Sequence, residues 1–238
     1  MLTFTTLASG SGGNAALVSC GDTHVLLDAG ISAKQITAGL AALGVTPREL
    51  TAILITHEHS DHVSGLRVLS KRAGAPIYAT SPTCRCLYDR NAGSEAAGLL
   101  RVMEAGTGVQ LGSLWAQSFP TPHDAAGSVG YILSGEESRI VLATDLGYIT
   151  PEVKAAVRDC GLLVCEANHD EDWVRSGPYP YYLKQRILGD RGHLSNEAGA
   201  ELAALAVERG TQAVVLAHLS HENNTPARAW ETAARHLR

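Results

Sequence analysis

The stretch Ile53-Leu54-Ile55-Thr56-His57-Glu58-His59-Ser60-Asp61-His62 carries the strongest signal in the sequence. Its first half is a short apolar run, which predicts a strand buried on both faces. Its second half supplies three histidines and two carboxylates within six residues. Imidazole nitrogens and carboxylate oxygens bind Zn²⁺, Mn²⁺ or Fe²⁺, whereas Ca²⁺ prefers oxygen ligands alone. We therefore predict a metal site at the end of this strand, in which one loop could serve two adjacent ions.

A short apolar strand followed by a histidine or an acid recurs at four further places. The residues at these strand ends are His123, Asp145, Glu166 and His218. If the strands belong to two packed sheets, their ends would gather these side chains at one edge. Two alternatives remain open, because Asp145 could instead cap a turn and His221 competes with His218. No linker or repeat interrupts the chain, so we expect a single domain, residues 1–238, with one site.

Composition narrows the class of protein. The chain has 238 residues, of which 45% are apolar and 18% charged, values typical of a soluble protein with a full core. It contains no run of eighteen apolar residues and no signal-peptide pattern, so neither a membrane partner nor export is expected. Five cysteines favour a reducing compartment, which we take to be the cytoplasm. The net charge of −5 gives no general attraction to nucleic acid.

Turn and cap residues predict the elements around these strands. Ser32, Thr150, Ser195 and Thr225 each stand where a helix N-cap is expected, and Pro151 and Pro226 occupy first helical positions. The glycines of residues 9–14 would let the backbone approach a ligand, although a flexible hairpin connection is an equal alternative. Residues 173–188 are aromatic and mildly basic.

Thr56-His57-x-His59-x-Asp61-His62, followed in order by His123, Asp145 and His218, resembles the metallo-β-lactamase family over nearly the whole chain. The resemblance implies an α/β fold, a four-layer αββα sandwich with a dinuclear site and no inserted cap domain. The runs at 9–14, 192–196 and 218–224 look most like the YycJ/WalJ branch, which is allied to nucleases and phosphodiesterases. Gly12 departs from this branch, which more often has a serine there, so the substrate contact at this position is in doubt.

The resemblance also implies roles for single residues. It implies two divalent ions, zinc or manganese with iron as a third candidate, and a hydroxide held between them as nucleophile. The implied ligands are His57, His59 and His123 for one ion, Asp61, His62 and His218 for the other, and Asp145 as the bridge. Asp61 would also orient the hydroxide. His193 would protonate the leaving oxygen with Glu166 as its partner, unless His193 only bonds the backbone of a capping loop. The predicted substrate-binding residues are Ser9, Ser11, Asn14, Ser195 and Asn196.

The activity implied is hydrolysis of phosphodiester bonds, most specifically as a 5′→3′ DNA exonuclease. Basic side chains could hold the phosphates that flank the reacting one, or could form an ordinary solvated helix face; they are Arg175, Lys184, Arg186 and Arg191. The net negative charge counts against DNA and favours a small cyclic or nucleotide phosphodiester as the alternative. Lactonase or thioesterase chemistry comes next. A non-catalytic metal-binding protein is disfavoured, because every expected ligand is present. The sequence does not indicate an oligomeric state.

Overall fold

The computed structural model describes residues 1–91 and 93–237, and these form two six-stranded mixed sheets with flanking helices. The strand order is β1-β2-β3-β4-β5-β6 in the first sheet and β12-β11-β10-β9-β8-β7 in the second. The strands are β1 (Leu2–Ala8), β2 (Ala15–Cys20), β3 (Thr23–Leu27), β4 (Ala52–Leu54), β5 (Ile77–Ala79), β6 (Leu100–Val102), β7 (Gly108–Leu111), β8 (Leu114–Pro120), β9 (Val129–Ser134), β10 (Arg139–Ala143), β11 (Leu162–Glu166) and β12 (Ala213–Ala217).

The helices alternate with many of these strands. They are α1 (Ala33–Ala42), α2 (Ser60–Val63), α3 (Leu66–Ala73), α4 (Ser81–Arg90), α5 (Glu95–Leu99), α6 (Pro151–Ala156), α7 (Glu171–Ser176), α8 (Tyr181–Leu188), α9 (Asn196–Glu208) and α10 (Pro226–His236), with one 3₁₀ turn, η1 (Pro47–Glu49). None of the helices in the described part of the chain combines the length and apolar character that crossing a bilayer requires.

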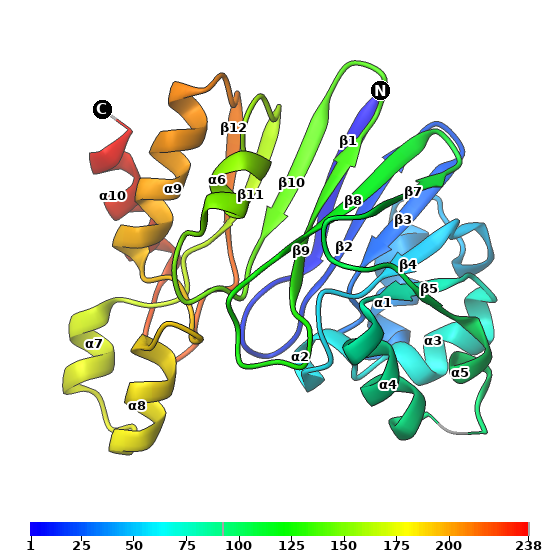
Figure 1. Ribbon diagram of the computed structural model, residues 1–238, viewed down its shortest axis with the longest axis horizontal. Helices are drawn as coiled ribbons and strands as arrows, with labels where there is room; N and C mark the ends of the chain where they lie inside the picture. The colour runs from blue at the N-terminus through cyan, green and yellow to red at the C-terminus, as the bar shows by residue number, and fades with distance from the viewer. Residues whose placement is uncertain (92, 238) are drawn as a thin grey trace. The chain divides into compact units, whose positions relative to one another are not determined.

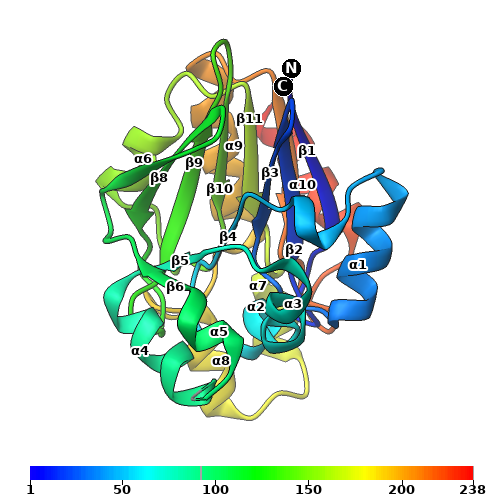
Figure 2. The ribbon, with the colours of Figure 1, turned by 90° about the vertical axis from the view of Figure 1, so that its right-hand side faces the viewer.

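The first sheet begins with antiparallel strands and continues with parallel ones. β1 and β2 pair antiparallel, as do β2 and β3, and β3 through β6 are parallel neighbours (Figure 2). All three residues of β4 are buried, as predicted for this stretch, because strands pair on both sides and apolar side chains cover both faces. Ile53 and Leu26 pack in one core with Ile36 of α1 and Leu69 of α3.

The second sheet contains a parallel group, β10-β11-β12. Helix α9 packs along β11 and β12, and α10 packs on α9 (Figure 1). Val141 and Leu163 of the strands share a core with Val153 of α6 and Leu202 of α9. Because these strands are parallel, their carboxyl ends lie at the same edge of the sheet, and the chain leaves each strand toward that edge.

Two compact units divide the chain. The first comprises residues Met1–Ser118, Ala125–Val129 and Leu133–Glu137; the second comprises Phe119–Asp124, Gly130–Ile132 and Ser138–Arg238. Each unit contributes part of the predicted site, and each part is described by itself below. The prediction of one domain for residues 1–238 stays a prediction.

The four predicted N-caps are confirmed. The side chains of Ser32, Thr150, Ser195 and Thr225 each accept a hydrogen bond from a backbone N–H in the first turn of their helix. The short elements α5, β6, α7 and α8 had not been predicted. α8 has no side-chain hydrogen bond at its N-cap, Pro180, and buries none of its residues, so neither a cap nor an apolar stripe marked it in the sequence.

Candidate metal centre

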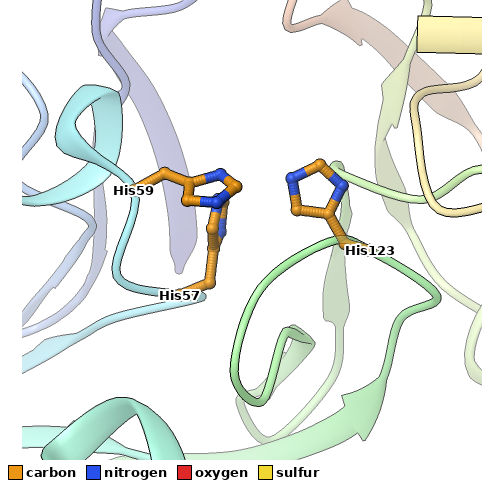
Figure 3. A group of neighbouring side chains, drawn as sticks. All are labelled: His57, His59 and His123. Carbon is orange, nitrogen blue, oxygen red and sulfur yellow. The ribbon is translucent and has the colours of Figure 1, made fainter. Parts of the chain in front are cut away.

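The first unit holds four of the predicted ligands on the segment after β4. We call them the first-unit cluster: His57, His59, Asp61 and His62. His59 is the N-cap residue of α2, and Asp61 lies in its first turn. The ring centroids of His57 and His59 are 4.5 Å apart, and those of His57 and His62 are 4.2 Å apart. Figure 3 shows the imidazoles of His57 and His59 close together where the chain leaves β4. The THxHxDH pattern therefore places three imidazoles in one small volume.

Asp28, at the end of β3, orients this cluster. Its carboxylate is buried and accepts hydrogen bonds from the Thr56 backbone N–H at 2.8 Å and the Thr56 hydroxyl at 3.0 Å. His62 Nδ1 lies 2.8 Å from Asp28 Oδ2. Because an ionised carboxylate only accepts, Nδ1 of His62 carries the proton and Nε2 keeps its lone pair. That is the tautomer a metal ligand needs, and a carboxylate behind a histidine is the usual way to fix it.

The glycine-rich segment 9–14 is tied to the first-unit cluster. Asn14 N–H donates to the Asp61 carbonyl at 2.7 Å, and the Asn14 amide lies 3.2 Å from His62 Nε2. The approach is tight at Gly30, where a Cβ would meet the Asp61 carbonyl oxygen at 1.6 Å. Only glycine fits there, so the loop after β3 and the histidine loop are held in one arrangement.

The second unit holds the remaining predicted ligands at the carboxyl edge of β10-β11-β12. These ligands are His123, Asp145 and His218, and together with the predicted catalytic pair, Glu166 and His193, we call them the second-unit cluster. Asp145 follows β10 and His218 follows β12, and both have left-handed backbone, with φ of 59° and 58°. Such φ values are uncommon for residues other than glycine and collect at functional sites. Ligand-type atoms of Asp145, Glu166, His193 and His218 all lie within 4.8 Å of one another.

The ring of His123 is oriented by a backbone carbonyl. Its Nδ1 lies 3.0 Å from the Gly192 carbonyl, which can only accept, so Nδ1 carries the proton and Nε2 the lone pair. Burial lowers the pKa of His123, and the nearby Asp145 carboxylate offsets this only in part. Nε2 lies 3.8 Å from Asp145 Oδ1. Two ligands about 2.1 Å from one tetrahedral ion lie roughly 3.4 Å apart, so this spacing suits shared coordination better than a hydrogen bond.

Glu166, at the end of β11, is the hub of the second-unit cluster. It is fully buried, and its Oε1 lies 2.8 Å from His218 Nδ1 and 3.0 Å from His193 Nδ1. Its Oε2 accepts from the backbone N–H groups of Leu194 at 2.9 Å and Leu146 at 3.2 Å. Burial raises the pKa of Glu166, but the charge on His193 and the imidazole hydrogen bonds outweigh it and lower the pKa to about 2. Four donors therefore surround an ionised carboxylate, which orients two histidines.

The predicted substrate-binding residues lie in two places. Ser9 and Ser11 are exposed in the loop after β1. Ser195 caps α9, and Asn196 is buried in a reciprocal amide pair with Asn224, at 3.0 and 2.8 Å. Ser195 and Asn196 also line a polar cavity of about 570 Å³ between α7, α9 and α10. Their part in substrate binding stays a prediction.

The family of the chain follows from comparison with known proteins. The family described as "Beta-lactamase superfamily domain" matches residues 23–219. The chain belongs to the beta-lactamase superfamily. Within the superfamily it is 38% identical to exodeoxyribonuclease WalJ of Streptococcus pneumoniae over 98% of this chain and 87% of that protein. It is 35% identical to exodeoxyribonuclease YycJ of Bacillus anthracis, over 94% and 84%. The fold is shared with YhfI of Bacillus subtilis (TM-score 0.76, 16% identity, 98% and 92% covered).

The donor chemistry of both clusters fits a metal ion. Each cluster combines imidazole nitrogens with carboxylate oxygens, and buried acceptors hold the distal nitrogens of His62, His123 and His218. Glu166 faces four donors, so its carboxylate is placed to orient His193 and His218. The chain thus carries a His/Asp set suited to metal binding.

Sequence reasoning missed Asp28 and the second partner of Glu166. Asp28 ends an apolar strand in the same way as Asp145 does, so the recurring pattern contained the signal. Its role depends on the parallel pairing of β3 with β4, which places Asp28 beside Thr56. Glu166 was expected to orient His193, and it contacts His218 as well.

We expect Asp28→Asn to weaken metal binding about 10- to 100-fold, because an amide cannot hold the Nδ1–H of His62 as an anion does. Asparagine tolerates the left-handed backbone of Asp28, whose φ is 58°, so the chain should still fold. The measurement is metal affinity by competition with a chelating dye. Asp159→Asn is the matched control, since Asp159 also has a positive φ, 52°, and lies outside both clusters. Equal affinities in the two variants would contradict the role of Asp28.

Proposed function

We propose that this chain is a metal-dependent exodeoxyribonuclease that hydrolyses DNA phosphodiester bonds from the 5′ end. The observation that carries the proposal is the pair His193–Glu166 beside Asp145. Nδ1 of His193 lies 3.0 Å from Glu166 and 3.7 Å from Asp145, while the side chain keeps 19% exposure. A proton donor next to a metal ligand is what expulsion of a poor leaving group such as a sugar alkoxide needs. DNA as substrate is supported by the likeness to WalJ and YycJ, which are named exodeoxyribonucleases.

Two divalent ions, zinc or manganese, complete the proposal. In this proposal one ion would be held by His57, His59 and His123, the other by Asp61, His62 and His218, and Asp145 would serve both. Such a pair supplies Lewis acidity and a water acidic enough to be a nucleophile near neutral pH. The chain's residues do the remaining work. Asp61 orients the attacking water, and His193 gives a proton from Nε2 to the leaving oxygen while Glu166 holds Nδ1.

The surroundings of His123 support its assignment as a ligand. Arg191 donates from Nε and Nη2 to the His123 carbonyl at 3.0 and 2.8 Å, and the Gly192 carbonyl accepts from the His123 ring. The segment that carries His193 and the loop that carries His123 therefore hold each other in place within the second unit.

All five cysteines are free thiols, which supports a location in the reducing cytoplasm.

The test is a nuclease assay on protein stripped of metal and then reloaded with Zn²⁺ or Mn²⁺. We expect the reloaded protein to degrade 3′-labelled single-stranded DNA progressively from its 5′ end, and the stripped protein to be inactive. Circular single-stranded DNA is the control for an end requirement. Bis-p-nitrophenyl phosphate is assayed in parallel, because its hydrolysis without DNA degradation would identify a small-molecule phosphodiesterase. Hydrolysis of neither substrate by metal-loaded protein would direct attention to thioesters and lactones.

A further inference from the structure

Helix α8 of the second unit exposes two adjacent aromatic side chains. Tyr181 is 77% and Tyr182 74% exposed, at the start of the helix and directly after Pro178-Tyr179-Pro180. The helix sequence, YYLKQRIL, contains two cations, Lys184 and Arg186, and no acid. Single exposed apolar residues are ordinary, but here two neighbouring exposed rings share one short helix with two basic residues.

The end of α8 leads directly into the predicted catalytic histidine. His193 N–H donates to the Ile187 carbonyl at 3.1 Å, and Gly192 N–H donates to the Gly189 carbonyl at 2.8 Å. A Cβ on Gly192 would meet the Ile187 carbonyl oxygen at 2.1 Å, so the backbone passes the helix end in close contact. Figure 1 shows α8 beyond the carboxyl end of β10, the strand that leads to Asp145. The position of α8 is thus coupled to that of His193.

Arg186 fixes the same helix to the loop of His123. Its guanidinium donates to the carboxylate of Asp124, the residue after His123. Tyr182 and Arg186 are four residues apart, so their side chains share one helix face with about 5–6 Å between Cβ atoms. The Tyr182 ring therefore stands one turn from a guanidinium that is joined to the predicted metal-binding loop.

A third exposed ring belongs to the same region of the second unit. Tyr148 is 50% exposed and follows Asp145 by three residues. Its neighbour Gly147 lies against the segment after α8, because a Cβ there would meet the Asp190 backbone at 2.2 Å. Exposed tyrosines thus occur on both segments that adjoin Asp145 and His193.

We propose that α8 is a base-stacking platform for single-stranded DNA, with Tyr182 as its main ring, Tyr181 as its second, and Lys184 and Arg186 near the strand's phosphates. This inference rests on the proposed nuclease function and names the strand that the site takes. Proteins that hold single strands combine cations along the backbone with aromatic rings on which bases stack, and this binding tolerates any base sequence. The bases of an intact duplex are stacked on each other, so the platform selects unpaired strands.

The test is the affinity of metal-loaded protein for a short, mixed-sequence, single-stranded oligodeoxynucleotide with a 3′ fluorophore and phosphorothioate linkages that slow its cleavage. We expect Tyr182→Ala to raise Kd about 5- to 100-fold. Tyr182→Phe should bind as wild type does, because the ring and not the hydroxyl stacks. Trp230→Ala is the matched control, since Trp230 is 65% exposed on α10 of the same unit.

A strand with abasic nucleotides gives the decisive comparison. Wild-type protein should bind it at least as weakly as Tyr182→Ala binds the normal strand, because the abasic strand also lacks the contact with Tyr181. Tyr182→Ala should bind the abasic strand no more weakly than wild type does, because the stacking contact that it removes is already absent. Additive losses, or equal Kd values for wild type and Tyr182→Ala on the normal strand, would overturn the platform while leaving the nuclease function standing. Wild-type protein that hydrolyses bis-p-nitrophenyl phosphate but neither binds nor degrades DNA would overturn both.

Discussion

Replacing His193 with alanine is expected to lower the rate of DNA cleavage about 10²- to 10⁴-fold, the usual contribution of a general acid. The leaving group in DNA is a sugar alkoxide, which must be protonated as it departs. Nitrophenolate needs no such help, so hydrolysis of bis-p-nitrophenyl phosphate should fall far less. The measurements are kcat and KM for both substrates, together with metal content.

His236→Ala is the matched control for this variant. His236 lies in the last turn of α10, pairs with Glu197 at 2.8 Å, and is outside both clusters. Its replacement should leave both rates unchanged. Equal losses on DNA and on the nitrophenyl ester in His193→Ala would show that His193 supports the centre as a whole instead of protonating the leaving oxygen.

The features that the sequence predicted involve residues close together in the chain, and those that it did not predict involve residues far apart. The first-unit cluster could be predicted because its four residues are nearly contiguous: His57, His59, Asp61 and His62. Packing does not explain why three imidazoles should follow a buried strand. The orienting groups were harder, because each acts across a long separation. Asp28 reaches His62 over 34 residues, and Glu166 reaches His218 over 52. Such contacts depend on which strands are neighbours, and the order β10-β11-β12 is a property of the fold, not of any one motif.

Helix α8 illustrates a second limit. Its sequence buries no residue and its first turn lacks a capping side chain, so neither packing periodicity nor a cap predicted a helix. The structure shows that its backbone, through Ile187 and Gly189, receives the N–H groups of His193 and Gly192. The basic side chains had indicated a phosphate-binding role, with a solvated helix face as the equal alternative; they are Arg175, Lys184, Arg186 and Arg191. The structure adds that Tyr182 and Arg186 lie on one face of α8, next to the His123 loop.

The second large effect is expected from Glu166→Gln. Oε1 of Glu166 faces the Nδ1 atoms of His193 and His218, while Oε2 faces the backbone N–H groups of Leu194 and Leu146. A glutamine must turn its NH₂ toward one of these pairs. In either orientation the NH₂ group, a donor, faces two other donors at a fully buried position. Each buried donor left without an acceptor costs about 1–3 kcal/mol, so the loss of a pair should lower the free energy of unfolding by about 2–6 kcal/mol.

The catalytic consequence of Glu166→Gln differs from that of His193→Ala. Glu166 orients His218 as well as His193, so metal affinity and proton donation should both suffer, and hydrolysis of DNA and of bis-p-nitrophenyl phosphate should each fall more than about 10²-fold. The measurements are denaturant unfolding, metal content and both rates. Glu197→Gln is the control, because Glu197 is exposed and pairs only at the surface with Arg235 and His236. A Glu166→Gln protein with wild-type stability and full metal content would contradict this role of Glu166, because a glutamine amide cannot accept hydrogen bonds from all four donors.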